Sequence, residues 1–449
     1  MKNFLKTTNK IICFIPLCCL ISAFSWADSI HQFSQDPWEN DSPNQYTGHS
    51  DEISHSLSNL WDNGTMVFTF RTVFRDRQPD NRQDYAYGAN AFAQTGNYYG
   101  FSVGGSYMLT NPFFADQMNQ QQPINIYVPS NKVNVLSQAF LQYTFPDVAQ
   151  VSVGRIAMDT PWIKTTTNNP LTNATYQGGL ANAQLGDSWF LTALYINAYK
   201  GIAQSEFTDN SMYTLSNNTA VASPIAGVAA LDLTVALGAE YTLDNTLHAG
   251  LWGYVFQNYV SMLYLDGEKT FEMGNHQALT LNLQSAVQSD FATGGSVATE
   301  LNLGTPNSRM LGAKLTYHHN WFSGGIASNL LWGPSGSFEN GGMVSPYTFN
   351  IANDPLYTTS FFAGMVEKGG GNAYKVFAAI KLLEDELVIT PSFAFYNITN
   401  GANSNELDLI TRYYFRNTGI ELGLVYGLTR TMGQDKLVST VQLRASYTV

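Results

Sequence analysis

The chain has little cysteine, little charge and few basic residues. Its three cysteines, Cys13, Cys18 and Cys19, all precede residue 28, so residues 28–449 offer no disulfide, thiol nucleophile or cysteine metal ligand. Only 12% of the 449 residues are charged, and 22 lysines and arginines face 34 acids, which gives a net charge of −12. Nucleic-acid binding requires clustered cations, so we expect no nucleic-acid partner.

Residues 1–27 have the pattern of a secretory signal peptide. Three lysines precede an apolar run over 11–24, and Ser25 and Ala27 supply the small residues typical of a cleavage site. The run is shorter than the ~18 residues of a membrane-spanning helix, which disfavours a transmembrane anchor. Removal of this segment, which holds three lysines and no acid, leaves a net charge of −15.

Apolar and polar side chains alternate along much of the remaining sequence. In residues 231–243, every second residue from Leu231 to Leu243 is apolar or aromatic, and acids such as Asp232 and Glu240 lie between them. A helical period would place acids and leucines on one face, so the pattern indicates β-strands. The same period recurs over residues 101–109, 279–283, 311–317, 376–382, 407–415 and 420–428.

These segments have the length of about ten residues that a tilted strand needs to cross a bilayer. They predict an all-β fold, a transmembrane antiparallel β-barrel of 16 to 18 strands over residues 61–449, which ends on an amphipathic strand from Val441 to Val449. Short links such as 243–246 predict tight turns, and the polar segments 207–226 and 333–362 predict extracellular loops. Residues 28–60 form a polar N-terminal extension.

A soluble β-sandwich or a β-solenoid is the alternative fold. So many strands of membrane-spanning length with so little charge are unusual in water, which favours the membrane barrel.

Residues 153–179 read VGRIAMDTPWIKTTTNNPLTNATYQGG and resemble the OprD family of substrate-specific outer-membrane porins. Met158-Asp159-Thr160-Pro161 matches the family's Leu/Met-Asp-Thr-Pro segment, and 170–178 approximates its Pro-x-Thr-Phe-like element. The resemblance implies 18 strands, a bacterial outer-membrane location and a third loop, about 157–178, that folds inward to constrict a pore. It also implies passive diffusion of small polar solutes such as carboxylates or amino acids.

The family's charged pair in this loop is missing from residues 165–169, which leaves Asp159 and Lys164 nearby. The loop therefore lacks the charges that would support the carboxylate or amino-acid solutes implied by the resemblance.

Charged side chains on the strands are expected to face the lumen, because an Arg or Lys toward lipid near the midplane costs about 2 to 4 kcal/mol. We predict that solute selectivity depends on Asp159, Lys164, Tyr176, Arg71, Arg75, Lys314, Arg412 and Arg416. The strand phase also turns inward Lys375, Lys381, Arg444, Asp232, Glu240, Asp408 and Glu421. Two interpretations stay open: a basic track that guides a carboxylate, or cations paired with lumen acids that stiffen the barrel.

No catalytic motif is present. The sequence lacks a Gly-x-Ser-x-Gly elbow and its seven histidines are scattered, so we expect no enzyme, cofactor or metal. His49, Asp51, Glu52 and His55 could ligate a divalent ion only on a folded segment, and they lie in the polar extension. A surface adhesin and, less favoured, an outer-membrane hydrolase are the alternative functions. Expected partners are small polar solutes, outer-membrane lipid, the barrel-assembly machinery and, if the protein is not a monomer, two further copies in a homotrimer.

Overall fold

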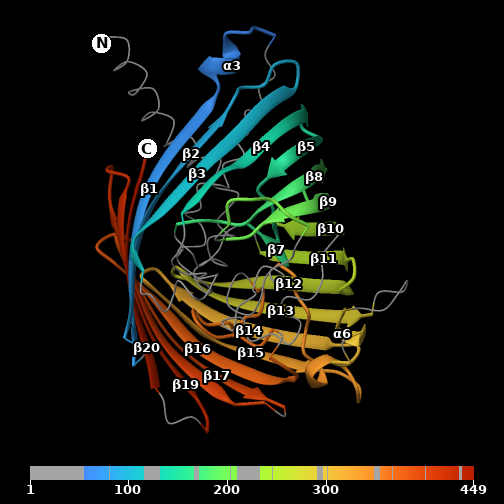
Figure 1. The fold of residues 1–449 in the computed structure, drawn as a ribbon, viewed down its shortest axis with the longest axis vertical. Coiled ribbons are helices and arrows are strands. Elements are labelled where there is room, and N and C mark those ends of the chain that lie inside the picture. Colours follow the sequence, from blue (N-terminus) through green and yellow to red (C-terminus); the bar gives the residue numbers. More distant parts are fainter. Residues whose placement is uncertain are drawn as a thin grey trace.

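Eighteen strands form one antiparallel sheet that closes on itself (Figure 1). The computed structural model describes residues 55–449 except 80, 116–131, 166–170, 203, 210–232, 245, 291–296, 301, 348–353, 367, 400 and 434–436. Asp232, the segment 28–54 and most of the segment 207–226 therefore lie outside the described residues.

The first half of the barrel consists of β1 (Thr65–Gln78), β2 (Arg82–Gln94), β3 (Phe101–Ala115), β4 (Val133–Phe145), β5 (Ala149–Ile156), β8 (Thr175–Leu185), β9 (Trp189–Lys200), β10 (Thr234–Leu243) and β11 (Leu247–Phe256). The second half consists of β12 (Val260–Gly274), β13 (Gln277–Ser289), β14 (Arg309–His319), β15 (Phe322–Trp332), β16 (Gly371–Leu382), β17 (Leu387–Ile398), β18 (Ser404–Phe415), β19 (Ile420–Thr431) and β20 (Leu437–Thr448). A separate hairpin joins β6 (Asp159–Thr160) to β7 (Ile163–Lys164).

Closure is made by the last strand. β20 pairs with β19 on one side and with β1 on the other, where Thr448 lies opposite Thr69 and Ser439 opposite Gln78. The ring therefore leaves neither β1 nor β20 as an unpaired edge, as a sheet inside a bilayer requires. The prediction of an antiparallel barrel with 18 strands is confirmed.

The two-residue period of the sequence becomes the two faces of the wall. On β12, Leu263 and Leu265 point outward and are 55% and 51% exposed, whereas Met262 and Tyr264 point inward and are each 3% exposed. Exposed leucines at that density would be unfavourable in water and favourable against lipid chains. The outer face is therefore an apolar belt suited to a membrane.

One end of the barrel has only short links between strands, and the other end carries all of the long loops. In the β12–β13 turn, Asn275 and His276 have φ of 52° and 60°, the left-handed conformation that a two-residue hairpin turn requires. Exposed aromatic side chains gather near this turn end; the rings of Phe101 and Tyr143 are 4.6 Å apart, and those of Trp189 and Tyr241 are 5.0 Å apart. Such a band of aromatic side chains is typical of the level at which a barrel meets the lipid headgroups.

Among the described residues the helices are short, namely α3 (Asn59–Asp62), α6 (Val297–Glu300) and the 3-10 helix η4 (Phe338–Asn340). In the described part of the chain, no helix has both the length and the apolar character needed to cross a membrane.

Two loops enter the barrel instead of leaving it. Loop 157–174 does so as predicted, although β8 begins at Thr175, so the loop ends before residue 178. Loop 333–370, of which residues 333–362 were predicted to form an extracellular loop, also turns inward, because Met343, Val344, Leu356 and Met365 are each at most 1% exposed. Their apolar side chains are buried against the inner wall, which offsets the entropy lost by ordering so long a loop.

Candidate functional site

The site is the constriction that these two loops form in the lumen. Loop 157–174 begins as the β6–β7 hairpin, in which Asp159 lies opposite Lys164. Thr160 closes the hairpin, because its Oγ1 accepts a hydrogen bond from the Ile163 N–H at 3.2 Å. Thr165 braces the other end, since its Oγ1 accepts from the Met158 N–H at 2.8 Å. The Asp-Thr-Pro segment thus folds a compact finger.

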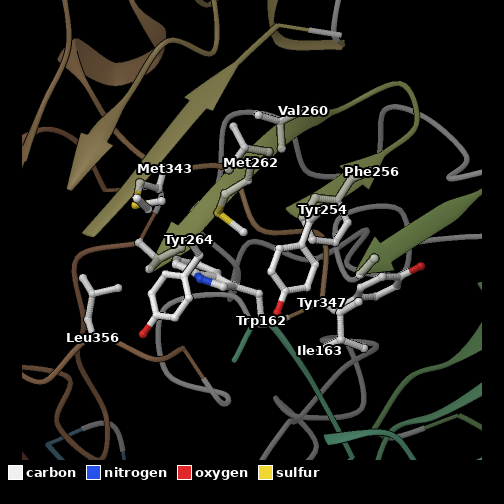
Figure 2. Close-up of a cluster of buried hydrophobic side chains, with 14 of the residues drawn as sticks. Trp162, Ile163, Tyr254, Phe256, Val260, Met262, Tyr264, Met343, Tyr347 and Leu356 are labelled. Carbon is white, nitrogen blue, oxygen red and sulfur yellow. The ribbon is translucent and has the colours of Figure 1, made fainter. Parts of the chain in front are cut away.

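The tip of this finger rests on an aromatic wall (Figure 2). The hydroxyl of Tyr254 on β11 donates to Thr160 Oγ1 at 3.2 Å, and the rings of Trp162 and Tyr264 on β12 are 6.1 Å apart. Trp162 and Ile163 are fully buried there. Loop 157–174 therefore reaches from β5 across the lumen to β11 and β12. The hydrogen bonds of Thr160 and Thr165 hold in place the apolar tip formed by Trp162 and Ile163.

Three tyrosines join the two loops to the wall. Tyr176 at the start of β8 is 5.6 Å from Tyr199 of β9, and Tyr347 of loop 333–370 is within 5.4 Å of both rings. The Tyr176 hydroxyl donates to the Lys164 carbonyl at 2.9 Å. Tyr176, predicted as a selectivity residue, is thus a fully buried support of loop 157–174.

Loop 333–370 is bound to the wall through its backbone. Gln288 of β13 both donates to the Val344 carbonyl at 2.7 Å and accepts from the Val344 N–H at 2.9 Å. Asn329 of β15 accepts from the Thr358 N–H at 3.1 Å. The loop backbone is buried here and is not part of a sheet, so these side-chain amides supply the hydrogen-bond partners that its N–H and carbonyl groups need.

Residues 358–363 of this loop contact four more wall side chains. Lys375 Nζ of β16 donates to the Thr359 carbonyl at 2.7 Å. The Tyr396 hydroxyl of β17 lies 2.8 Å from the Thr358 carbonyl and 3.0 Å from the Ala363 carbonyl. Asp408 and Glu406 of β18 accept from the N–H groups of the two phenylalanines at 361 and 362, at 3.2 and 2.7 Å.

A buried carboxylate also lies inside loop 333–370. Asp354 Oδ1 accepts from the Leu356 N–H at 3.0 Å and from the Thr359 hydroxyl. Burial raises the pKa of Asp354 to about 7, while the hydrogen bonds and the charges of Lys368 and Lys164 oppose the rise. Burial also lowers the pKa of Lys368. The two inward loops therefore interact electrostatically as well as by packing.

The loops meet above one side of the wall. Leu171 of loop 157–174 packs with Phe361 and Phe362 of loop 333–370, together with Val73 of β1 and Val425 of β19. A Cβ at position 427 on β19 would lie 2.5 Å from the Phe362 ring, so Gly427 makes room for that ring. Between the loop and β1–β3 remains a cavity of about 10 Å³, room for about one water molecule. Its lining is Thr69, Arg71, Gly88, Ala89, Asn90, Met108, Leu171 and Asn173.

Most predicted lumen cations do point inward. Arg75 and Lys314 are at most 9% exposed, and Lys314 Nζ is 5.0 Å from the Tyr357 ring centroid. The guanidinium of Arg444 is 4.9 Å from the ring centroid of Phe361. Arg412 Nε is 2.9 Å from Glu421 Oε1. Lys314 and Arg444 thus contact aromatic rings of loop 333–370. Arg412 has an acid partner, as expected if lumen cations pair with acids to stiffen the barrel.

Arg416 is the exception, and its predicted inward position is wrong. It follows the last residue of β18, is exposed, and pairs with Glu384 at 2.6 Å and Glu386 at 3.3 Å in the β16–β17 turn. The strand phase does not extend past Phe415, so alternation cannot place a residue in the turn.

Three arginines gather on one side of the lumen and three acids lie on the far side, while the inward acids Glu406, Asp408 and Glu421 are on β18 and β19. Arg71 and Arg75 are on β1, with Arg444 on the adjacent β20; β12, which carries Asp266 and Glu268, is nine strands away in the ring of 18. Figure 1 shows β1 and β20 at the left and β10 to β12 at the right. On the acidic side, His248 lies 3.8 Å from Glu240 and 3.7 Å from Asp266. Within the described residues, no three His, Cys, Asp or Glu side chains gather as a metal site.

Sequence reasoning missed the residues that hold loop 333–370, among them Tyr347, Tyr396 and Glu406. The strand phase places Tyr396 and Glu406 on the inner face, but nothing in the sequence says that a loop 30 to 70 residues earlier is their partner. The one available signal was the apolar content of residues 338–366, which is unusual for a loop in water.

Comparison with known proteins places the fold. No family model matches the sequence, and no curated protein matches it. Solved structures do match. The outer-membrane protein OpdK of Pseudomonas aeruginosa, in its structure with vanillate, has a TM-score of 0.69 and 14% identity, over 86% of this chain and 99% of that one.

Two other P. aeruginosa proteins are similar to the same extent. OccK2 (OpdF) in complex with glucuronate has a TM-score of 0.71 and 12% identity over 87% of this chain and 99% of that one. OccD3 (OpdP) has a TM-score of 0.68 and 13% identity over 88% and 93%. These neighbours are porins of the OprD family, and their likeness to this chain in fold covers 86% to 88% of it. The chain has the fold of the OprD-family substrate-specific porins.

Proposed function

We propose that the protein is an outer-membrane channel through which small polar solutes diffuse passively, with a preference for solutes that carry a carboxylate. The observation that carries the proposal is the closed wall itself, apolar outside and lined inside by charged and polar side chains. A lumen of this kind is a path for solutes, and the charges along it select among them.

The distribution of charge supports the carboxylate preference. Arg71, Arg75 and Arg444 form what we call the basic wall, and Glu240, Asp266 and Glu268 lie halfway around the ring. A carboxylate in the lumen is attracted to the basic wall and repelled from the acidic one, so its approach is guided to one side. Two structural neighbours were solved with vanillate and glucuronate, both carboxylates, which agrees with this preference.

The constriction predicts a size limit. Loop side chains fill the middle of the lumen between the two walls, and Arg71 lines the small cavity that remains against β1–β3. We infer that this narrow section limits passage to compact solutes.

Planar-bilayer recording of the purified protein tests the channel, and solute uptake into liposomes tests the preference. We expect discrete conductance steps and faster uptake of glucuronate than of an uncharged sugar of equal size. A single charge 4 Å from a carboxylate in water contributes about 1 kcal/mol, so Arg71→Gln should reduce that preference about fivefold. Protein that inserts into bilayers without conductance steps would favour the adhesin alternative.

A further inference from the structure

The strongest unexplained feature is the way loop 333–370 is held. Side chains from β15, β16, β17 and β18 all bind backbone atoms of residues 358–363, and none of these bonds depends on the identity of a loop side chain. A wall that binds backbone fixes the path of the chain. These contacts therefore specify where the loop runs across the lumen.

Two acids on β18 bind the middle of this backbone segment. Glu406 and Asp408 are adjacent on the inner face and are at most 1% exposed. Glu406 Oε1 accepts from the Phe362 N–H at 2.7 Å, and its Oε2 accepts from the Thr429 hydroxyl at 3.1 Å. Asp408 Oδ2 accepts from the Phe361 N–H at 3.2 Å and from the Ser392 hydroxyl at 3.5 Å. Each carboxyl group thus supplies an acceptor to a buried loop N–H, a group that is costly to leave without a hydrogen bond.

The position of the two phenylalanines matters beyond the loop. The Phe361 ring lies under the guanidinium of Arg444, part of the basic wall, at 4.9 Å. Both rings also pack with Leu171 of loop 157–174. Movement of the Phe361–Phe362 backbone would therefore displace both Arg444 of the basic wall and Leu171 of loop 157–174.

We propose that Glu406 and Asp408 are positioning residues: by binding the Phe361 and Phe362 N–H groups they hold loop 333–370 across the lumen, and so set the conductance of the channel and the place of Arg444. This inference rests on the proposed channel function. It assigns the two acids a role as hydrogen-bond acceptors, which differs from the role of lumen charges that strand phase alone suggests.

The distinction can be tested because an amide keeps the acceptor oxygen but loses the charge. We compare the double variant Glu406→Gln/Asp408→Asn with Glu406→Ala/Asp408→Ala in planar bilayers. Each lost hydrogen bond should shift the loop roughly tenfold, about 1.4 kcal/mol, toward the released state. We expect the alanine variant to show a larger conductance and a changed reversal potential, and the amide variant to stay close to wild type.

Glu421 is the matched control, because it is an inward acid on the next strand whose carboxylate pairs with Arg412. Its effect is through charge, so Glu421→Gln and Glu421→Ala should change the reversal potential equally. If the same equality holds at 406 and 408, the two acids are lumen charges and the positioning role is overturned.

Limited proteolysis of detergent-solubilised barrels gives a second readout, in which only the alanine variant should gain cleavage within 354–366. Equal cleavage of both variants would also overturn the inference. If the double alanine variant does not fold, the single variants Glu406→Ala and Asp408→Ala are compared with their amides in the same way. A wild-type protein that forms no channel would instead refute the proposed function, which separates the two failures.

Discussion

Removal of a single hydroxyl tests how firmly loop 333–370 is held. Tyr396 of β17 is fully buried, and its hydroxyl lies within hydrogen-bonding distance of two loop carbonyls, those of Thr358 and Ala363. Tyr396→Phe keeps the ring and its packing but leaves both carbonyls without this donor. A buried polar group left unsatisfied costs about 1 to 3 kcal/mol.

This free-energy cost determines how often loop 333–370 is released from the wall. Since 1.4 kcal/mol is a factor of ten, the docking equilibrium of the loop should shift roughly ten- to a hundredfold toward release. The barrel itself should lose little stability, because the ladder hydrogen bonds of β17 do not change and the aromatic ring still fills its site.

Single-channel recording should show this as more frequent openings to a larger conductance, together with faster proteolysis inside residues 354–366. Tyr374→Phe is the matched control: it removes a hydroxyl from the neighbouring strand β16 on the exposed outer face, and we expect no change in gating. If Tyr396→Phe leaves openings and proteolysis at the wild-type level, the backbone contacts do not govern the loop and our reasoning is wrong.

Three further changes test other parts of the structure. Leu265→Arg places a cation on the lipid face of β12 and should reduce the free energy of unfolding from vesicles by about 2 to 4 kcal/mol, whereas a loss near zero would contradict the assignment of that face. Burial raises the pKa of Asp354 from 3.8 to about 7, so the folded loop binds the proton more tightly than the unfolded chain does. Docking is then strongest below pH 4 and weakens by about 4 kcal/mol as the pH rises to 7, and proteolysis at pH 5 and pH 8 should differ in wild type but not in Asp354→Asn. Arg416→Gln removes an exposed ion pair in a turn and should leave the reversal potential unchanged. Arg412→Gln removes a cation from the inner face, so its reversal potential should indicate greater cation selectivity. Equal shifts in the two variants would show that Arg416 also faces the lumen.

Most of the fold could be predicted from the alternation of apolar and polar residues in the strands. Alternation as in Leu263 and Leu265 against Met262 and Tyr264 specifies which face meets lipid, because a shift of one residue would reverse every side chain. For the same reason it placed Arg75, Lys314 and Arg444 correctly on the inner face. It failed at Arg416, where the strand has ended and the period no longer applies.

The constriction was predicted only in part. Asp159-Thr160-Pro161 marked the loop that enters the lumen, but the sequence did not reveal that Thr160 binds Tyr254 on the facing wall. Residues 333–362 were predicted to form an extracellular loop because polar, glycine-rich segments between strands are usually solvent-exposed. That this loop turns into the lumen was not predicted, although its methionines and aromatic residues were a sign of burial.

The amino-acid sequence by itself determined the phase of the strands and which strand charges face inward, and it limited the number of strands to 16 to 18, because these depend on local periodicity and on the cost of placing charge in lipid. Only the tertiary structure decided what occupies the lumen. The contacts of Glu406, Asp408 and Tyr396 with residues 358–363 join positions more than thirty residues apart, and no local pattern encodes such a pairing.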